Sequence, residues 1–156
     1  MERLINIAAG GVQLLLHGKV AQAAALCVRK TKNGSEVLLL SNRSGGKWGI
    51  PKGNIDVGET SAKAAARESY EEAGVRGRVS SEILGTYTYR KSRRNWPLHV
   101  TVHALDAAEI DDDFPESAER RRKWVPLAEA ARHVHQPGLK DVLRDLRSQP
   151  PKLPFA

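Results

Sequence analysis

The sequence contains a single cysteine, Cys27, among its 156 residues. One cysteine cannot form an internal disulfide or build a zinc cluster, and scarce cysteine is typical of reducing compartments. Long apolar runs are also missing, because none approaches the roughly 20 residues that a membrane-spanning helix requires. The apolar stretch near the N-terminus is interrupted by Asn6 and Gly10 and does not resemble a signal peptide. We therefore expect a cytoplasmic protein without a membrane partner, in which Cys27 is a buried structural thiol.

The composition is ordinary for a globular protein, with 40% apolar and 28% charged residues. A chain of this length suits one domain. We expect that single domain to span 1–156, with a core over about 20–147 and an irregular, proline-rich tail over 148–156. The net charge of +7 suggests an anionic partner but does not identify one. Nucleic acid, inositol phosphates, nucleotides and anionic lipid all remain open on charge alone.

Alternating or continuous apolar residues between turn-forming residues predict several strands. The predicted strands are 12–17, 23–29, 36–41, 79–89, 98–105 and 124–126, and the predicted helices are 60–73, 127–134 and 139–146. We expect residues 106–119 to form an acidic loop and residues 120–123 to be a solvated basic run. This mixture of strands and helices predicts the α/β (α+β) class in one domain.

The predicted helix over 60–73 has two distinct faces. One is a stripe of small residues that would let the helix lie close to a sheet, formed by Ala62, Ala65, Ala66, Ser69 and Ala73. The other carries Glu68, Glu71 and Glu72 within about one turn. Like charges at this spacing destabilise an isolated helix, so something should compensate them.

Three compensations are compatible with the sequence. Arg67 can pair with Glu71 four residues later, or the acidic face can be solvated. Alternatively, a hard cation such as Mg²⁺ or Mn²⁺ can bind there, because these ions prefer oxygen ligands. The preceding loop favours the cation, since Gly53 and Gly58 permit a bent backbone that can aim a carbonyl at the same ion.

The spacing of this segment resembles the signature of the Nudix hydrolases, G-x5-E-x7-R-E-U-x-E-E-x-G-U, where U is a bulky apolar residue. The matching positions are Gly53, Glu59, Arg67, Glu68, Glu71, Glu72, Gly74 and Val75. Ser69 departs from the signature at one U position. The resemblance extends over about Ala23 to Leu146. This part of the chain is similar to the family branch that contains diphosphoinositol polyphosphate phosphohydrolases and diadenosine polyphosphate hydrolases.

This resemblance implies the Nudix fold, a mixed β-sheet sandwiched between helices, with the signature forming a loop-helix-loop. It also implies Mg²⁺-dependent or Mn²⁺-dependent hydrolysis of a phosphoanhydride. Metal ligation is implied for the Gly53 carbonyl, Glu68, Glu71 and Glu72. Catalytic roles are implied for Glu71, Arg67 and Glu68: Glu71 is a ligand or the general base, and Arg67 orients the carboxylates. Glu59 is implied to brace the loop against the helix.

Candidate substrate residues lie outside the signature. Arg29, Arg43 and Lys52 surround the presumed site in the sequence, and phosphate-rich substrates need such donors. The segment from Arg90 to Arg94 is a basic cluster near Tyr87, Tyr89 and Trp96, and from it we select Arg93 and Arg94 as phosphate contacts. A solvated hairpin loop is the alternative for that segment. Glu116 or Glu119 could add a metal ligand.

These observations predict a pyrophosphohydrolase acting on a phosphate-rich small molecule, a dinucleoside polyphosphate or a diphosphoinositol polyphosphate. In the inositol branch basic residues precede the first long strand, whereas only Lys19 is basic in the stretch Lys19–Gln22, which counts against that pocket. Two alternatives remain: removal of pyrophosphate from the 5′ end of RNA, which is not preferred, and a non-catalytic Nudix-fold binding module. The complete glutamate set argues against the second. We also expect Ser69→Ala to be tolerated unless the hydroxyl finds a backbone partner.

Overall fold

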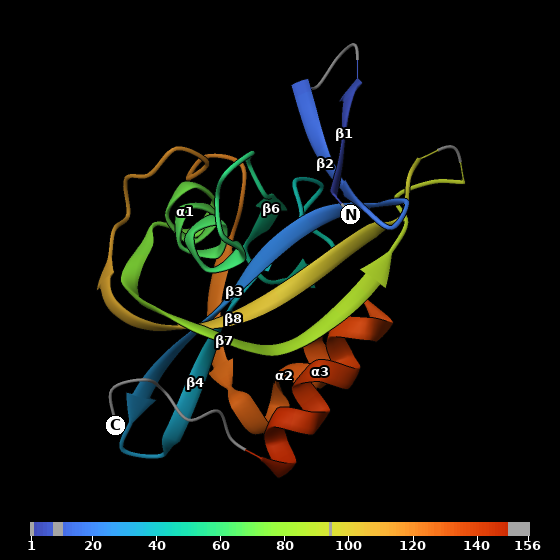
Figure 1. The fold of residues 1–156 in the computed structure, drawn as a ribbon. Coiled ribbons are helices and arrows are strands. Elements are labelled where there is room, and N and C mark those ends of the chain that lie inside the picture. The colour runs from blue at the N-terminus through green and yellow to red at the C-terminus, as the bar shows by residue number, and fades with distance from the viewer. Residues whose placement is uncertain (1, 8–10, 94, 150–156) are drawn as a thin grey trace.

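The long strand β3 (Lys19–Thr31) is the centre of the fold in this computed structural model, which describes residues 2–7, 11–93 and 95–149. Strands β2, β4, β6 and β8 all pair with β3, and the remaining strands extend the sheet through them (Figure 1). The other strands are β1 (Glu2–Ile7), β2 (Gly11–Leu16), β4 (Gly34–Ser41), β5 (Trp48–Gly49), β6 (Lys52–Asn54), β7 (Val75–Tyr89), β8 (Leu98–Ile110) and β9 (Arg122–Pro126).

The sheet is mixed. Strands β3 and β8 run parallel, with Val20 opposite Leu98 and Val28 opposite Asp106. The pairs β3–β4, β3–β6, β4–β9 and β7–β8 are antiparallel. This arrangement confirms the predicted class and the mixed sheet.

Helices cover both faces of this sheet (Figure 1). Helix α1 (Ser61–Ala73) lies on one face, and α2 (Leu127–His133) and α3 (Pro137–Ser148) lie on the other. Alternation along β3 divides the buried side chains accordingly, since successive residues of a strand point to opposite faces. Ala23, Ala25 and Cys27 belong to the core beneath α1, whereas Leu26 and Val28 belong to the core beneath α2 and α3.

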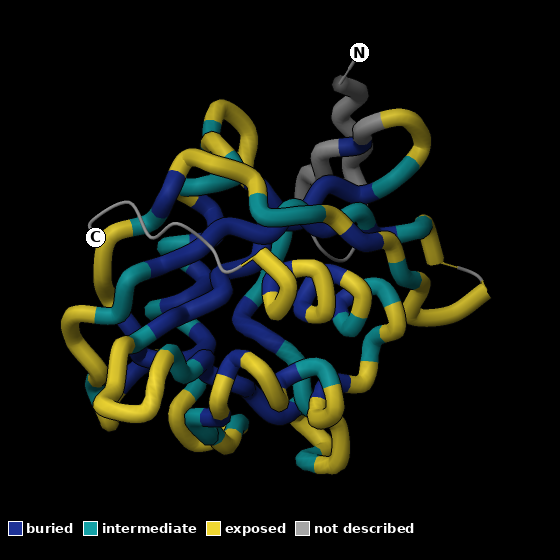
Figure 2. Tube along the Cα trace, turned by 90° about the horizontal axis from the view of Figure 1, so that it is seen from below, coloured by how far each residue is buried: buried dark blue, intermediate teal, exposed yellow. Residues whose placement is uncertain are grey.

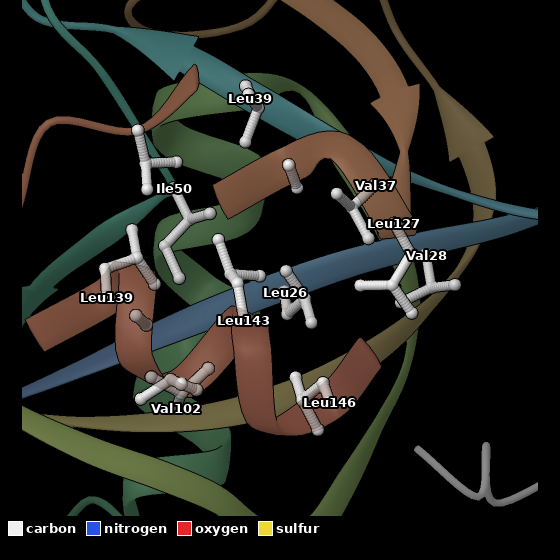
Figure 3. Packing of buried hydrophobic residues seen from close by; sticks show 14 of the residues in the cluster. Leu26, Val28, Val37, Leu39, Ile50, Val102, Leu127, Leu139, Leu143 and Leu146 are labelled. Atoms are coloured by element: carbon white, nitrogen blue, oxygen red, sulfur yellow. The ribbon is translucent and has the colours of Figure 1, made fainter. Parts of the chain in front are cut away.

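The larger core is built from aliphatic side chains of the sheet and of the two C-terminal helices. Figure 3 shows Leu139, Leu143 and Leu146 of α3 packed towards Leu26 and Val102 of the central strands. Figure 2 shows the buried strands inside the molecule and exposed residues on the outer turns of the helices. In the described part of the chain, no helix combines the length and apolarity needed to cross a bilayer.

Local signals position α1 as expected. The Thr60 side chain accepts a hydrogen bond from the Lys63 amide, and Gly74 ends the helix in the left-handed conformation at φ 69°. Both helix ends agree with the prediction. Ser69 is fully buried, and its hydroxyl donates to the Val75 carbonyl at 2.9 Å and lies 3.2 Å from Cys27 Sγ. The hydroxyl therefore has a backbone partner, which is the condition under which Ser69→Ala is not expected to be tolerated.

Several predicted boundaries were wrong. Strands β3, β7 and β9 begin earlier than predicted, at Lys19, Val75 and Arg122. Strand β8 continues to Ile110, so the first residues of the expected acidic loop are strand, held by backbone pairing with β7 such as Val75 opposite Ile110. Helix α3 continues to Ser148, which we had assigned to the irregular tail. The expected tail over 150–156 lies outside the described residues.

The segment from Asp111 to Arg121, which we call the β8–β9 loop, is attached to the C-terminal end of α1. The Asp111 amide donates to the Gly74 carbonyl at 2.8 Å, and the Glu116 amide donates to the Glu71 carbonyl at 3.1 Å. Just after the loop, Arg122 Nη1 donates to the Ala73 carbonyl at 2.9 Å. These donors satisfy carbonyls that a helix end leaves without partners. The prediction that residues 120–123 form a solvated run was therefore wrong for Arg122.

Candidate active site

Strand β6, the following loop and α1 bring the acidic face of the helix against the central sheet. Gly53 pairs with Ala23 of β3, so the strand carries its backbone to the edge of α1. A Cβ at Gly53 would collide with the Glu68 carboxylate. The backbone at Gly53 and this carboxylate therefore lie in direct contact, and a side chain at position 53 would force the Glu68 carboxylate to move.

Arg67 connects the loop to the helix. Its Nε and Nη2 donate to the two carboxylate oxygens of Glu59 at 3.0 and 2.9 Å, a bidentate pair. Nη1 donates to Glu68 Oε1 at 2.6 Å, and Nη2 also donates to the Asn54 carbonyl at 2.9 Å. The hydrogen bond from Arg67 holds the pKa of Glu59 below its ordinary value. Arg67 and Glu59 thus fix the loop and orient Glu68.

Glu68 and Glu72 are buried carboxylates one turn apart on α1. Burial raises the pKa of Glu68 above its ordinary value and raises the pKa of Glu72 to about 7, because desolvation disfavours the charged form. Glu72 Oε2 accepts from the Lys52 amide at 3.1 Å, and Oε1 lies 3.4 Å from Arg120 Nη2. The pair is incompletely compensated and would be stabilised by additional positive charge.

These residues fit a hard divalent cation. Within 2–7, 11–93 and 95–149, no three His, Cys, Asp or Glu side chains are already grouped as a metal site. The donor set is instead two buried carboxylates, Glu68 and Glu72, beside the backbone of Gly53. All of these donors are oxygens, which Mg²⁺ and Mn²⁺ prefer. The contact between the Gly53 backbone and the Glu68 carboxylate is the observation that supports this fit.

Two further glutamates lie next to this pair. The Glu71 side chain is 44% exposed, and its Oε2 lies 3.6 Å from Arg67 Nη1. Glu116, on the β8–β9 loop, accepts from Arg120 Nε at 3.3 Å and from Arg43 Nη2 at 3.0 Å. Glu116 lines a cavity together with Glu68 and Glu72. Glu116 can therefore approach a water molecule near the buried carboxylates, whereas the wall of that cavity does not include Glu71.

Two adjoining cavities open beside Glu72. The first, of about 710 Å³, contains the carboxylates and includes Gly53, Arg43 and Glu116 in its wall. The second, of about 520 Å³, extends towards α3 and includes the aromatic residues Trp48 and Tyr87. The two share Asn42, Lys52, Glu72, Tyr89, Lys91 and Arg120. A ligand could therefore span both cavities across the position of Glu72.

Comparison with known proteins decides the family. A family model described as the NUDIX domain matches residues 20–146 of the chain. The chain belongs to the Nudix family. The predicted family and the predicted hydrolase class are thereby confirmed.

Several Nudix relatives are similar over most of this chain. Human diphosphoinositol polyphosphate phosphohydrolase 3-beta is 30% identical over 130 residues, which cover 81% of this chain and 77% of the relative. Nudix hydrolase 16, mitochondrial, of Arabidopsis thaliana is 35% identical over 114 residues, covering 69% and 63%. Among solved structures, the Ap4A hydrolase of C. elegans is 27% identical with a TM-score of 0.63, covering 83% of this chain and 97% of that one. The predicted branch is confirmed by these similarities.

The structure brings only some of the predicted substrate residues to this Nudix site. Arg43 and Lys52 line the cavity that contains the carboxylates. Arg29 does not: it pairs with Glu36 at 2.9 Å, and it lies five residues along β3 from Ala24, the partner of Lys52, or roughly 16 Å. Arg93 lines a separate shallow cavity with Trp96. Arg94 lies outside the described residues.

Other residues of the site were missed from the sequence. Lys91 lines both cavities, although we had selected Arg93 and Arg94 from the same basic segment. Arg120 was expected to be solvated, but its side chain is only 16% exposed and contacts Glu72 and Glu116. Alternate residues of a strand share one face, so extending the predicted strand 124–126 back through the basic run could have indicated that Arg120 and Arg122 point inwards. Trp48 and His135 gave no sequence signal of their place in the second cavity.

Proposed function

We propose that this Nudix hydrolase uses Mg²⁺ or Mn²⁺ to cleave a phosphoanhydride bond in dinucleoside polyphosphates. The supporting observation is the second cavity beside Glu72, where positive charge and aromatic rings occur together. Its wall includes the cations Lys47, Lys52, Arg90, Lys91 and Arg120 and the rings of Trp48, Tyr87 and Tyr89. Cations pair with phosphate oxygens, and aromatic rings stack on nucleobases. A nucleotide with several phosphates uses both properties.

Residues of the signature would hold the metal and orient its ligands. The Gly53 carbonyl, Glu68 and Glu72 are the proposed donors, and Arg67 fixes the Glu68 carboxylate against the Glu59-braced loop. When bound, the metal would neutralise charge on the phosphates and lower the pKa of a coordinated water. Lys52 and Lys91 stand at the junction of the two cavities, where they can bind phosphate oxygens on either side.

A general base must remove a proton from the attacking water, and two carboxylates compete for that role. Glu71 is partly exposed beside Arg67, which leaves its carboxylate accessible to water. Glu116 lines the cavity that contains Glu68 and Glu72. We propose Glu71 as the base or as an additional metal ligand, with Glu116 as the competing candidate. Glu71→Gln and Glu116→Gln separate them, because loss of the base lowers kcat by about 10²–10⁴ and moves the acidic limb of the pH profile.

Diphosphoinositol polyphosphates are the second candidate, because the human relative is named for that substrate. One uncharged part of the wall of the carboxylate cavity counts against them. Gln22 donates to the Asn54 side chain at 2.9 Å and accepts from the Tyr89 hydroxyl at 3.1 Å, so three uncharged groups satisfy one another there. A pocket for an inositol ring that carries many phosphates would need cations at such positions.

Substrate comparison tests the proposal. A dinucleoside tetraphosphate, a diphosphoinositol polyphosphate and 5′-triphosphate RNA would be assayed with Mg²⁺ and with Mn²⁺, and the products identified. We expect the highest kcat/KM for the dinucleoside tetraphosphate and a loss of about 10²–10⁴ in Glu72→Gln. Glu36→Gln, on the distant β3–β4 hairpin, is the matched control and should stay within about twofold. Wild-type rates in both Glu68→Gln and Glu72→Gln would exclude the proposed site.

We also propose that the protein works in the cytoplasm as a reduced protein. Its one cysteine is fully buried between β3 and α1, where burial raises the pKa of the thiol to about 12. Such a thiol contributes packing and needs no oxidising compartment. Fractionation of the source cells would test the location, and recovery in a membrane-enclosed organelle would contradict it.

A further inference from the structure

Arg120 makes three contacts that join the acidic helix, the β8–β9 loop and the sheet. Its Nη2 lies 3.4 Å from Glu72 Oε1, its Nε lies 3.3 Å from Glu116 Oε1, and its Nη1 donates to the Ser41 carbonyl at 3.2 Å. The side chains of Arg120 and Glu72 are 16% and 11% exposed. A largely buried guanidinium therefore lies against one oxygen of a buried carboxylate.

A cation that binds Glu72 would find Arg120 already in contact with that carboxylate. One carboxylate oxygen accepts from the Lys52 amide, and the other faces Arg120. A divalent cation on Glu72 would share that carboxylate with the guanidinium, and like charges at such a separation repel strongly where water is scarce. Arg120 has other acceptors, since Glu116 and the Ser41 carbonyl remain when its contact with Glu72 is lost.

We infer that Arg120 and the divalent cation compete for Glu72, so that Arg120 holds the carboxylate before the cation binds and is displaced from it afterwards. This inference rests on the proposed metal-dependent function. Glu116 and the Ser41 carbonyl would keep the displaced guanidinium near both cavities, which Arg120 lines. The same charge that stabilises the metal-free site therefore weakens metal binding. Removing it should tighten the binding of the metal, whereas removal of a residue that only supports a metal ligand would weaken it.

The test is the affinity for Mn²⁺ without substrate, measured by isothermal titration calorimetry. Coupling between competing ligands typically amounts to at least about fivefold, so Arg120→Gln should bind Mn²⁺ about fivefold more tightly than the wild type. Arg121→Gln is the matched control, because it removes an equal charge from the next residue, whose exposed side chain contacts the Gly45 carbonyl instead of Glu72. We expect that control to stay within about twofold. Unchanged or weaker binding in Arg120→Gln would overturn the competition.

A measurement on the wild-type protein keeps the test independent of the folding of that variant. The Nε–H signal of Arg120 can be followed by NMR during titration with Mg²⁺ and assigned from its absence in Arg120→Lys. We expect this signal to move and its exchange with water to accelerate as Mg²⁺ saturates the site. An unmoved signal at saturation would overturn the competition. Failure of the proposed function is distinguishable, because in that case the wild type would show no Mn²⁺ binding that depends on Glu72.

Discussion

The hydroxyl of Ser69 should stabilise the fold, although the Nudix signature places an apolar residue at this position. Ser69 is fully buried on the face of α1 that packs on β3, and its Oγ donates to the Val75 carbonyl at 2.9 Å. Ser69→Ala removes the donor and leaves that buried carbonyl without it, which costs about 1–3 kcal/mol. Alanine is a better helix former than serine and returns roughly 0.5 kcal/mol. We therefore expect a net loss of about 1–2 kcal/mol in the free energy of unfolding.

Urea unfolding followed by circular dichroism measures this loss. The midpoint should fall while the m-value stays constant, because the variant changes stability without changing the surface exposed on unfolding. For a domain of this length, the expected loss corresponds to a fall in Tm of about 2–8 °C. Ser44→Ala, in an exposed loop, is the control and should stay within about 0.5 kcal/mol. A Ser69→Ala variant as stable as the wild type would show that the hydrogen bond contributes nothing net and would refute this reasoning.

Three further predictions follow from the site and the core. Because burial raises the pKa of Glu72 to about 7, the metal-free folded protein retains a proton that the unfolded chain releases above its ordinary pKa. The contribution of this proton to the free energy of unfolding is complete below about pH 4.5 and is lost as the pH rises through 7. The stability of the wild type in EDTA should therefore fall by roughly 3 kcal/mol relative to that of Glu72→Gln over that range. Identical pH profiles of the two proteins would contradict this prediction. Lys91→Ala should raise KM for a dinucleoside tetraphosphate about fivefold, whereas Arg29→Ala should change it less than twofold, and steady-state kinetics of both variants would decide. Cys27 should resist a thiol reagent at pH 8 in the native protein and react fully in urea, and rapid native labelling would disprove its burial.

Elements with local signals were predictable from the sequence. Helix α1 begins after Thr60 and ends at Gly74 because a side-chain cap and a left-handed glycine act within one turn of each end. The β3–β4 hairpin follows from two apolar runs around Gly34, which has φ 114°. In both cases the determining residues lie within a few positions of the structure that they determine.

Features that depend on distant partners were not predictable in this way. Arg120 is separated from Glu72 by 48 residues. The arginine-rich run around it predicts an exposed side chain, whereas the fold places an acidic partner beside it. The end of β8 resembles a loop in the sequence because it carries Asp106 and Glu109. Strand pairing uses the backbone, however, and tolerates acidic side chains at half-exposed and exposed positions. Arg29 is predicted near the site because the sequence does not show how far β3 continues. The strand carries Arg29 five residues beyond Ala24, away from Lys52.

The attachment of the β8–β9 loop to α1 restricts how this enzyme can be lengthened or diversified. Surface loops usually accept insertions at little cost in chain entropy. An insertion between Asp111 and Glu116 would instead release the amides that meet the carbonyls of Gly74 and Glu71, and would carry Glu116 away from the buried carboxylates. The segment over 90–97 has no such attachment to the acidic helix among the hydrogen bonds of the described residues and borders the second cavity through Arg90 and Lys91. We therefore expect the segment over 90–97 to accept insertions that the β8–β9 loop does not.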